Sequence, residues 1–264
     1  MTTTFPSASP PTVTTEDPDA PENAVVLDGV TKRYGRGRGA VTALADVSLS
    51  FPAGSFTAVM GVSGSGKSTL LQCAAGLERP TSGGVRLFAT DLTGLSQRRQ
   101  AKLRRRRIGF VFQDLNLVPE LSIAENIALP LRLDHRRAER ADIEHAAARV
   151  GLAPAQLKRL PMELSGGQQQ RVAIARALIT RPDVIFADEP TGALDPYTGQ
   201  GVLRLLRTAA DGSTVVIVTH DPQVVRFCDR AVFLHAGRVD RMIYAPEPVA
   251  VARVLHELGE RGRG

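Results

Sequence analysis

The sequence has little of what several classes of protein require. Its 264 residues include no tryptophan, only two cysteines and 5% aromatic residues. Two cysteines cannot build a disulfide framework, and no Cys/His cluster has metal-ligand spacing, so we expect a reduced, cytoplasmic protein. No run approaches the roughly 18 consecutive apolar residues that span a bilayer, and the first residues lack the basic start and apolar run of a secretory signal. A link to a membrane must therefore come through a partner.

The composition is that of a globular protein. Lys and Arg number 33 against 27 Asp and Glu, with 43% hydrophobic and 23% charged residues, which excludes mainly disordered and fibrous chains. Residues 1–23 are the exception, because proline, threonine, serine and acidic residues dominate there and cannot bury a core. We therefore predict a disordered tail over 1–23 and a single domain over 24–264, since one α/β domain can absorb this length.

Apolar runs alternate with helix-like segments, which predicts an α/β fold. Strands are expected at 25–30, 47–51, 56–60, 108–112, 184–187 and 215–218, and helices after Gly66 and at 138–150, 166–179, 198–210 and 248–258. Between 114 and 181 no strand is indicated, whereas Ile143, Ala146, Ala147 and Val150 share one helical face. This interval predicts an inserted helical subdomain over about 114–182.

A glycine-rich motif follows the strand expected at 56–60. Residues 61–69 read GVSGSGKST and fit the phosphate-loop pattern G-x-x-x-x-G-K-[ST]. The candidate phosphate-binding residues of this loop are Gly61, Ser63, Gly64, Ser65, Gly66, Lys67, Ser68 and Thr69. Backbone N–H groups and the start of the next helix would face phosphate oxygens, Lys67 would reach the terminal phosphates, and Ser68 would ligate Mg²⁺.

Two carboxylates follow the apolar strand expected at 184–187. A magnesium ion bridging two phosphates needs a further hard oxygen ligand, and Asp188 is placed to supply it. Glu189 then projects from the same strand end toward a water in line with the γ-phosphate, which is the geometry of a general base for hydrolysis. The sequence therefore predicts hydrolysis of a nucleoside triphosphate with Mg²⁺, with Lys67 and Glu189 as catalytic residues.

A second anion-binding helix start occurs at LSGGQ. Ser165 is a residue type that caps helices, and Gly166, Gly167 and Gln168 follow it. A simple capped helix would explain Ser165 but not two adjacent glycines, which lower helix propensity. The segment has no lysine, so it is interpreted as half of a site whose other half lies elsewhere.

Together these motifs resemble those of the ATP-binding cassette (ABC) ATPases, whose signature sequence is LSGGQ. The resemblance covers about 24–239 and seven motifs in family order. It implies a P-loop NTPase core with a mixed sheet, an antiparallel β subdomain and an inserted helical subdomain. It also implies that two subunits, expected to be a homodimer, sandwich two ATP molecules, each phosphate loop facing the partner's signature.

The resemblance assigns roles to four more residues. Tyr34 resembles the aromatic residue that stacks on adenine, a use that suits its π-face. Gln113 resembles the Q-loop glutamine, which touches Mg²⁺ or the attacking water. Asp195 resembles the D-loop aspartate at the dimer interface. His220, after the strand expected at 215–218, resembles the switch histidine that contacts the γ-phosphate and is counted as catalytic.

Residues 116–122 and 125–131 resemble a group that includes macrolide-exporter, lipoprotein-release, antimicrobial-peptide-resistance and cell-division ATPases. In that group the ATPase is a peripheral subunit on the inner face of the membrane. It binds a permease whose short cytoplasmic helix docks between the core and the helical subdomain. A regulatory ATPase acting on a non-transporting membrane partner shares every motif. A P-loop kinase is the further alternative, but it would not need LSGGQ.

Two classes of soluble cassette ATPase are further alternatives. Translation ATPases usually carry two cassettes and DNA-repair ATPases a long coiled coil, and the sequence has neither.

The run Arg104–Arg107, with Arg98, Arg99 and Lys102, could form a nucleic-acid or lipid-headgroup patch. It lacks interleaved aromatic residues, so we interpret it as the solvated face of a helix and expect no nucleic-acid partner.

Overall fold

The computed structural model describes residues 23–210 and 212–262. The predicted tail therefore lies outside the described residues, except Asn23, which is the first residue of a strand. The strands are β1 (Asn23–Tyr34), β2 (Val41–Pro52), β3 (Phe56–Met60), β4 (Ser82–Leu87), β5 (Thr90–Asp91), β6 (Ile108–Val111), β7 (Val184–Asp188), β8 (Thr214–Val218), β9 (Arg230–His235) and β10 (Arg238–Tyr244). The α-helices are α1 (Lys67–Ala74), α2 (Gln97–Arg107), α3 (Ile123–Leu133), α4 (Arg140–Arg149), α5 (Gly166–Leu178), α6 (Pro196–Ala209) and α7 (Pro248–Arg261).

A six-stranded mixed sheet forms the centre, in the order β10-β9-β3-β8-β7-β6. Its five strands from β9 to β6 run parallel, and only the edge strand β10 is antiparallel. Every residue of β3 and β8 is buried, as a strand covered on both faces requires. Because the strands are parallel, β3, β7 and β8 end at one edge of the sheet, and the residues that follow them meet there.

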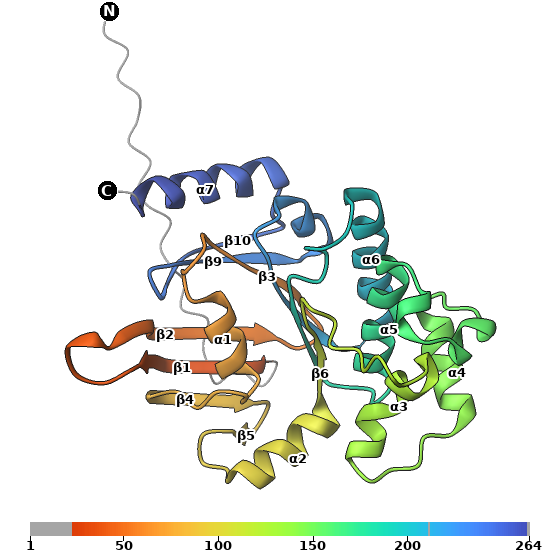
Figure 1. Cartoon of the computed structure of the whole chain (residues 1–264). Helices are drawn as coiled ribbons and strands as arrows, with labels where there is room; N and C mark the ends of the chain where they lie inside the picture. Colours follow the sequence, from red (N-terminus) through yellow and green to blue (C-terminus); the bar gives the residue numbers. More distant parts are fainter. Residues whose placement is uncertain (1–22, 211, 263–264) are drawn as a thin grey trace, which may run out of the picture.

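A second sheet is antiparallel, in the order β2-β1-β4-β5. Helix α1 lies between the two sheets (Figure 1), and its Leu70 and Ala74 share one core with residues of both, including Leu27 of β1 and Val218 of β8. The predicted combination of a mixed sheet with an antiparallel β subdomain is confirmed.

The helical part lies beside the central sheet (Figure 1), where α3, α4 and α5 pack on one another. As expected, the structure has no strand between residues 114 and 181, all of which it describes. Ala146, Ala147 and Val150 are buried, in agreement with the helical periodicity. A reciprocal capping box between Ser122 and Glu125 opens α3, where each residue satisfies an amide of the other.

The sequence prediction missed several elements for local reasons. Helix α3 contains Pro130, which normally argues against a helix interior. Strand β4 begins with a serine and two glycines, and β10 is half-exposed throughout, so neither shows a clear alternation. Strand β4 depends on pairing with β1, which is distant in sequence, and β10 depends on pairing with β9.

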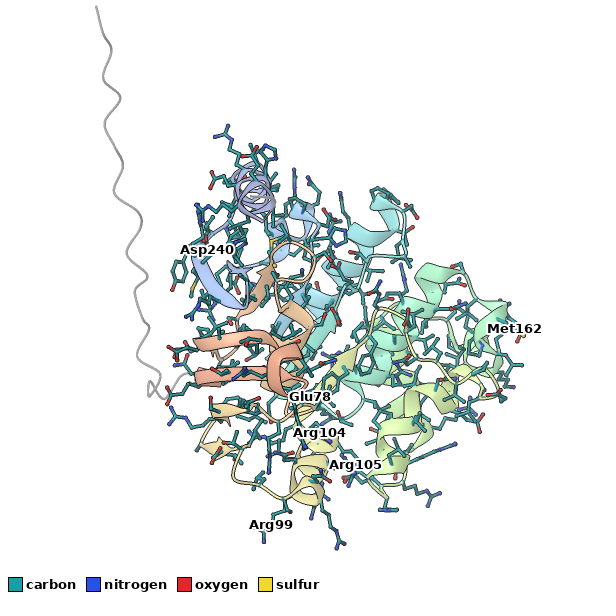
Figure 2. The ribbon with its side chains drawn as sticks, turned by 60° about the vertical axis from the view of Figure 1, so that its left-hand side comes forward. Glu78, Arg99, Arg104, Arg105, Met162 and Asp240 are labelled. Carbon is teal, nitrogen blue, oxygen red and sulfur yellow. The ribbon has the colours of Figure 1, made fainter. Side chains whose placement is uncertain are left out.

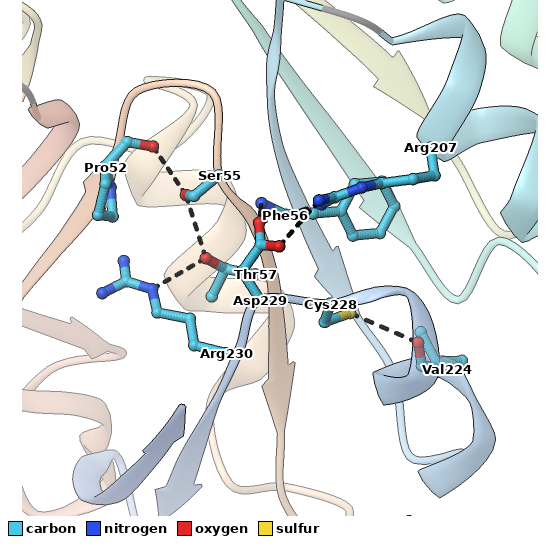
Figure 3. A network of polar contacts seen from close by, with 9 residues as sticks. All are labelled: Pro52, Ser55, Phe56, Thr57, Arg207, Val224, Cys228, Asp229 and Arg230. Atoms are coloured by element: carbon cyan, nitrogen blue, oxygen red, sulfur yellow. Dashed lines mark hydrogen bonds and ion pairs between the residues drawn. The ribbon is translucent and has the colours of Figure 1, made fainter. Parts of the chain in front are cut away.

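A polar network lies at the sheet edge opposite the strand ends described above (Figure 3). Arg230 is 2% exposed, and its Nε donates to Thr57 Oγ1 at 3.0 Å. Next to it, the Asp229 carboxylate accepts the Phe56 amide at 2.7 Å and pairs with the Arg207 guanidinium at 2.8 Å. The network therefore ties β9 and α6 to the start of β3. The buried guanidinium of Arg230 is hydrogen-bonded, as burial of a charge requires, whereas the Arg207–Asp229 pair is exposed.

Candidate nucleotide-binding site

The phosphate loop connects β3 to α1, and two of its glycines are required by close backbone contacts. At Gly66 φ is +102°, and a Cβ there would lie 2.4 Å from the Ala43 carbonyl oxygen. At Gly61 a Cβ would lie 2.3 Å from the Leu234 carbonyl oxygen. Helix α1 begins directly after Gly66, and its first amides have no partner within the helix. The loop thus ends at a helix start suited to phosphate oxygens.

A cavity of about 330 Å³ opens beside this loop. Its lining residues are Ala43, Ser63, Gly64, Gly66, Lys67, Ser68, Thr69, Gln113, Asp188, Glu189 and Val218. The Lys67 Nζ donates to the carbonyl oxygens of Gly61 at 3.0 Å and Val62 at 2.9 Å. Burial lowers the pKa of Lys67, while the charges of Glu189 and Asp188 oppose that shift. An ammonium held by loop carbonyls can turn to an anion without unfolding the loop.

Ser65 lies beneath the loop rather than in the cavity. Its side chain is 2% exposed, and its hydroxyl has no hydrogen-bond partner among the described residues. Its backbone closes the turn, since its N–H donates to the Val62 carbonyl at 3.2 Å and its carbonyl accepts the Gly237 amide at 3.0 Å. The backbone of Ser65 therefore helps to fix the shape of the loop.

The two carboxylates lie at the end of β7, next to the phosphate loop. Burial raises the pKa of Asp188, and the charge of Glu189 adds to the shift. A hydrogen bond from Ser68 and the charge of Lys67 act in the opposite direction. The Ser68 hydroxyl and Asp188 carboxylate are therefore neighbouring hard oxygens, which is the donor type that Mg²⁺ prefers.

Both carboxylate oxygens of Glu189 are held. Oε2 accepts the Thr219 hydroxyl at 3.0 Å, and Oε1 lies 2.7 Å from Nδ1 of His220. The Glu189 side chain is only 14% exposed, whereas that of His220 is 74% exposed. The Glu189 backbone has φ of 45°, an uncommon value for a residue with a side chain, and its amide donates to the Val218 carbonyl at 2.8 Å. Such strain concentrates at functional sites.

Sequence reasoning missed two residues that hold this site together. Thr219 is fully buried at the end of β8, and its hydroxyl also accepts the Asp221 amide at 3.1 Å. Arg176 of α5 donates to the carbonyl oxygen of Asn116 at 2.5 Å and to that of Leu115. It thereby fastens the segment after Gln113 to α5. The only sequence signal for Thr219 was its place between an apolar strand and His220.

The signature helix start lies outside the cavity. Ser165 caps α5, since its Oγ accepts the Gln168 amide while Gln168 Oε1 accepts the Ser165 amide at 3.0 Å. Ser165 and Gly166 are exposed, and no residue from 165 to 168 lines the cavity. Within one chain, the structure therefore does not bring the signature to the phosphate loop.

Tyr34 and Asp195 also lie outside the cavity lining. Tyr34 ends β1 with its side chain 39% exposed, and Lys32 Nζ lies 5.0 Å from the ring centroid. Asp195 caps α6 by accepting the amides of Tyr197 at 3.1 Å and Thr198 at 3.0 Å. One face of the Tyr34 ring is therefore occupied by a cation, while much of its surface is open.

A phosphate loop after one parallel strand, with acidic residues at the end of another strand of the same sheet, defines a P-loop nucleoside triphosphatase. The family model described as "ABC transporter" matches residues 44–192, more than half of the chain. The chain belongs to the ABC transporter family, as an ATP-binding subunit that hydrolyses ATP.

Relatives agree with this assignment. The chain is 45% identical over 224 residues to the "Uncharacterized ABC transporter ATP-binding protein MJ0796" of Methanocaldococcus jannaschii, covering 82% of this chain and 95% of that protein. It is 42% identical over 227 residues to the "Lipoprotein-releasing system ATP-binding protein LolD" of Bordetella pertussis, covering 84% and 98%. It also matches the "Macrolide export ATP-binding/permease protein MacB" of Rhodopseudomonas palustris, at 44% identity over 87% of this chain but 36% of that protein. The group suggested by the sequence is therefore confirmed.

The fold is similar to a solved cassette. "Dimeric structure of a post-hydrolysis state of the ATP-binding cassette MJ0796 bound to ADP and Pi" matches with a TM-score of 0.77 and 42% identity, covering 84% of this chain and 99% of that one. The predicted fold class is confirmed. In the part of this chain that the structure describes, no helix is long and apolar enough to cross a membrane.

Proposed function

We propose that this chain hydrolyses ATP in two pockets that two copies complete together, and that the cycle moves a separate bacterial permease. One observation carries the proposal. Lys67, Asp188 and Glu189 line one cavity, whereas Ser165, the capped start of the signature helix, lies exposed outside it. A second copy would bring its own Ser165 to the phosphates. Asp195 would lie at the interface between the copies.

The residues around the cavity suit ATP and Mg²⁺. Ser68, Asp188 and Gln113 would hold the ion, which when bound neutralises charge on the phosphate oxygens. Lys67 would exchange the carbonyls of Gly61 and Val62 for the terminal phosphates. The loop amides and the start of α1 would bind the remaining phosphate oxygens.

Glu189 would take the proton of the attacking water. A carboxylate has about four acceptor positions, so the contacts with Thr219 and His220 leave room for a water. Those two contacts would fix the direction of the carboxylate, which is a positioning task for the Thr219 hydroxyl. His220 is the exposed member of the pair and does not line the cavity, so its ring would have to turn toward the pocket to contact a γ-phosphate.

Tyr34 would stack on the adenine ring. Replacing Tyr34 by Ala is expected to raise the Kd for ATP by about 10-fold, because aromatic stacking on a base contributes roughly 1–3 kcal/mol. Tyr34→Phe keeps the π-face and should bind nearly as tightly. Calorimetric titration with ATP measures both, and Tyr244→Ala, which removes a tyrosine that is 56% exposed on β10, is the matched control. Equal affinity of Tyr34→Ala and wild type would remove the stacking role.

An apolar groove of about 450 Å³ would receive the permease. It lies between α2, β6, α3 and α5, and includes Leu129, Pro130 and Leu133 of α3. Phe112 lines this groove and the next residue, Gln113, lines the nucleotide cavity. A short permease helix docked in the groove would therefore move with the ligand state. We assign residues 114–182 to a helical subdomain that transmits this motion at the inner face of the membrane.

The groove variant Leu133→Glu tests the proposed partner. Leu133 is 58% exposed, so a charge there should leave the fold intact while blocking an apolar segment. Co-purification from detergent-solubilised membranes should recover an integral membrane permease with the wild type and at least about 10-fold less with Leu133→Glu. Met162→Glu, at a residue 82% exposed outside the groove, is the control. Equal recovery by both variants would contradict docking in the groove, and cargo flux in reconstituted vesicles would separate a transporter from a regulatory ATPase.

A further inference from the structure

Helix α2 carries a basic surface that the nucleotide site does not use. Its eleven residues include six arginines and one lysine and no acidic residue. The inner side of the helix is anchored, because Gln100 is buried and its Nε2 donates to the Leu92 carbonyl at 2.5 Å. Leu103 packs against the core that lies between the two sheets.

Four of the arginines have structural partners. Arg104 donates to the Gly76 carbonyl, and Arg107 pairs with Asp183. Arg106 pairs with Asp134 at 2.9 Å, and Arg105 reaches the same carboxylate at 3.6 Å. All four arginines belong to the C-terminal end of α2.

Arg98, Arg99 and Lys102 are the basic residues left over, and we call them the α2 basic face. All three are exposed, and their side chains have no hydrogen bond or ion pair with any described residue. Figure 2 shows Arg99 pointing away from the body of the molecule, whereas Arg104 lies toward it near Glu78. Arg98 and Lys102 stand four residues apart on one helix face, where like charges destabilise a helix. A free surface of this kind is suited to an anionic partner outside the chain.

We propose that the α2 basic face binds the headgroups of anionic phospholipids. The proposal rests on the proposed function, since α2 forms one wall of the groove that would hold the permease, through Ala101, Arg104 and Arg105. With a permease docked in that groove, α2 would lie on the side of the molecule that faces the bilayer. The face lacks the aromatic residues on which nucleic-acid bases stack. Each lysine or arginine near an anionic leaflet adds attraction, so three together supply a useful supplement to the permease contact.

Vesicle sedimentation with the full chain tests the proposal. Wild type should sediment with vesicles of about 30% phosphatidylglycerol in phosphatidylcholine and not with phosphatidylcholine alone. The triple variant Arg98→Gln, Arg99→Gln, Lys102→Gln should reduce the partition coefficient roughly 100-fold, at about fivefold for each charge. ATP hydrolysis by the triple variant should equal that of wild type, because the three residues lie outside the nucleotide cavity.

A charge-matched control makes the result specific. Arg204→Gln, Arg238→Gln, Arg253→Gln removes three exposed arginines on α6, β10 and α7. If that variant loses as much binding as the α2 variant, or if wild type binds neither vesicle or binds both equally, the proposal is overturned. Stronger α2-dependent binding to a DNA duplex at the same salt concentration would also overturn it, in favour of a nucleic-acid surface. The vesicle experiment contains neither permease nor ATP, so the two experiments are independent. A lack of vesicle binding would not affect the result of the Leu133→Glu co-purification, and a failed co-purification would not affect vesicle binding.

Discussion

Glu189→Gln is expected to lower ATP turnover by at least about 100-fold while ATP and Mg²⁺ still bind, because a general base contributes roughly 10²–10⁴-fold. The amide keeps the size of the carboxylate, and its oxygen can still accept the Thr219 hydroxyl that Oε2 accepts at 3.0 Å. What it loses is the ability to take a proton from water. Phosphate release measures turnover, and calorimetric titration measures ATP binding.

The same substitution should accumulate a dimer. ATP that binds but is not hydrolysed would keep two copies closed around it, so size-exclusion chromatography with ATP and Mg²⁺ should shift from monomer to dimer. Glu144→Gln is the control, because Glu144 is an exposed partner of Arg140 on α4, with 2.6 Å between Oε1 and Nε. Normal turnover in Glu189→Gln would exclude its role as base. Loss of ATP binding would instead indicate that the substitution damages the pocket.

The sequence predicted those site residues that come directly after a strand or at its end. Lys67 and Ser68 sit at a fixed spacing after β3, and Asp188 and Glu189 at the end of β7. In a parallel sheet, local spacing along each strand translates into proximity at one edge, so Lys67, Asp188 and Glu189 line one cavity as expected. Their assigned roles remain predictions that the variants above test.

The contacts that depend on distant packing could not be predicted in the same way. Arg176 reaches the carbonyls of Leu115 and Asn116 across about sixty positions of sequence, and nothing in the helix motif reveals that partner. Thr219 contacts Glu189 only because β7 and β8 are neighbours in the sheet. The sequence of a single strand does not predict which strands will be its neighbours. The contacts of both residues therefore depend on the sheet order and on the packing of α5.

Arg176 also suggests how the two halves of a split pocket communicate. It belongs to α5, whose first turn carries the exposed signature, and it holds the segment that follows Gln113. Its guanidinium is largely buried, and burial lowers its pKa, so its bonds to those carbonyls are made where water competes little. A displacement of Gln113 on ATP binding would thus be passed to Ser165, which is the residue that meets the other copy.

Mixing two inactive variants should restore ATP hydrolysis if each pocket takes residues from two chains. Lys67→Ala removes the phosphate contact, and Ser165→Arg blocks the signature, so each variant alone should lose at least about 100-fold in turnover. In the mixed dimer one pocket carries both defects, and the other combines Lys67 of one copy with Ser165 of its partner. An equal mixture should therefore contain roughly a quarter of the intact pockets of wild type.

A second mixture controls for nonspecific rescue. Lys67 and Glu189 line the same cavity of one chain, so Lys67→Ala mixed with Glu189→Gln leaves every pocket defective and should show no recovery. Phosphate release, followed over a dilution series, should show recovered activity in the first mixture that falls as the dimers dissociate. If both mixtures regained the same ATP turnover, or if Ser165→Arg alone kept normal turnover, each chain would contain a complete pocket. The exposed position of Ser165, outside the cavity lining, argues for the shared arrangement.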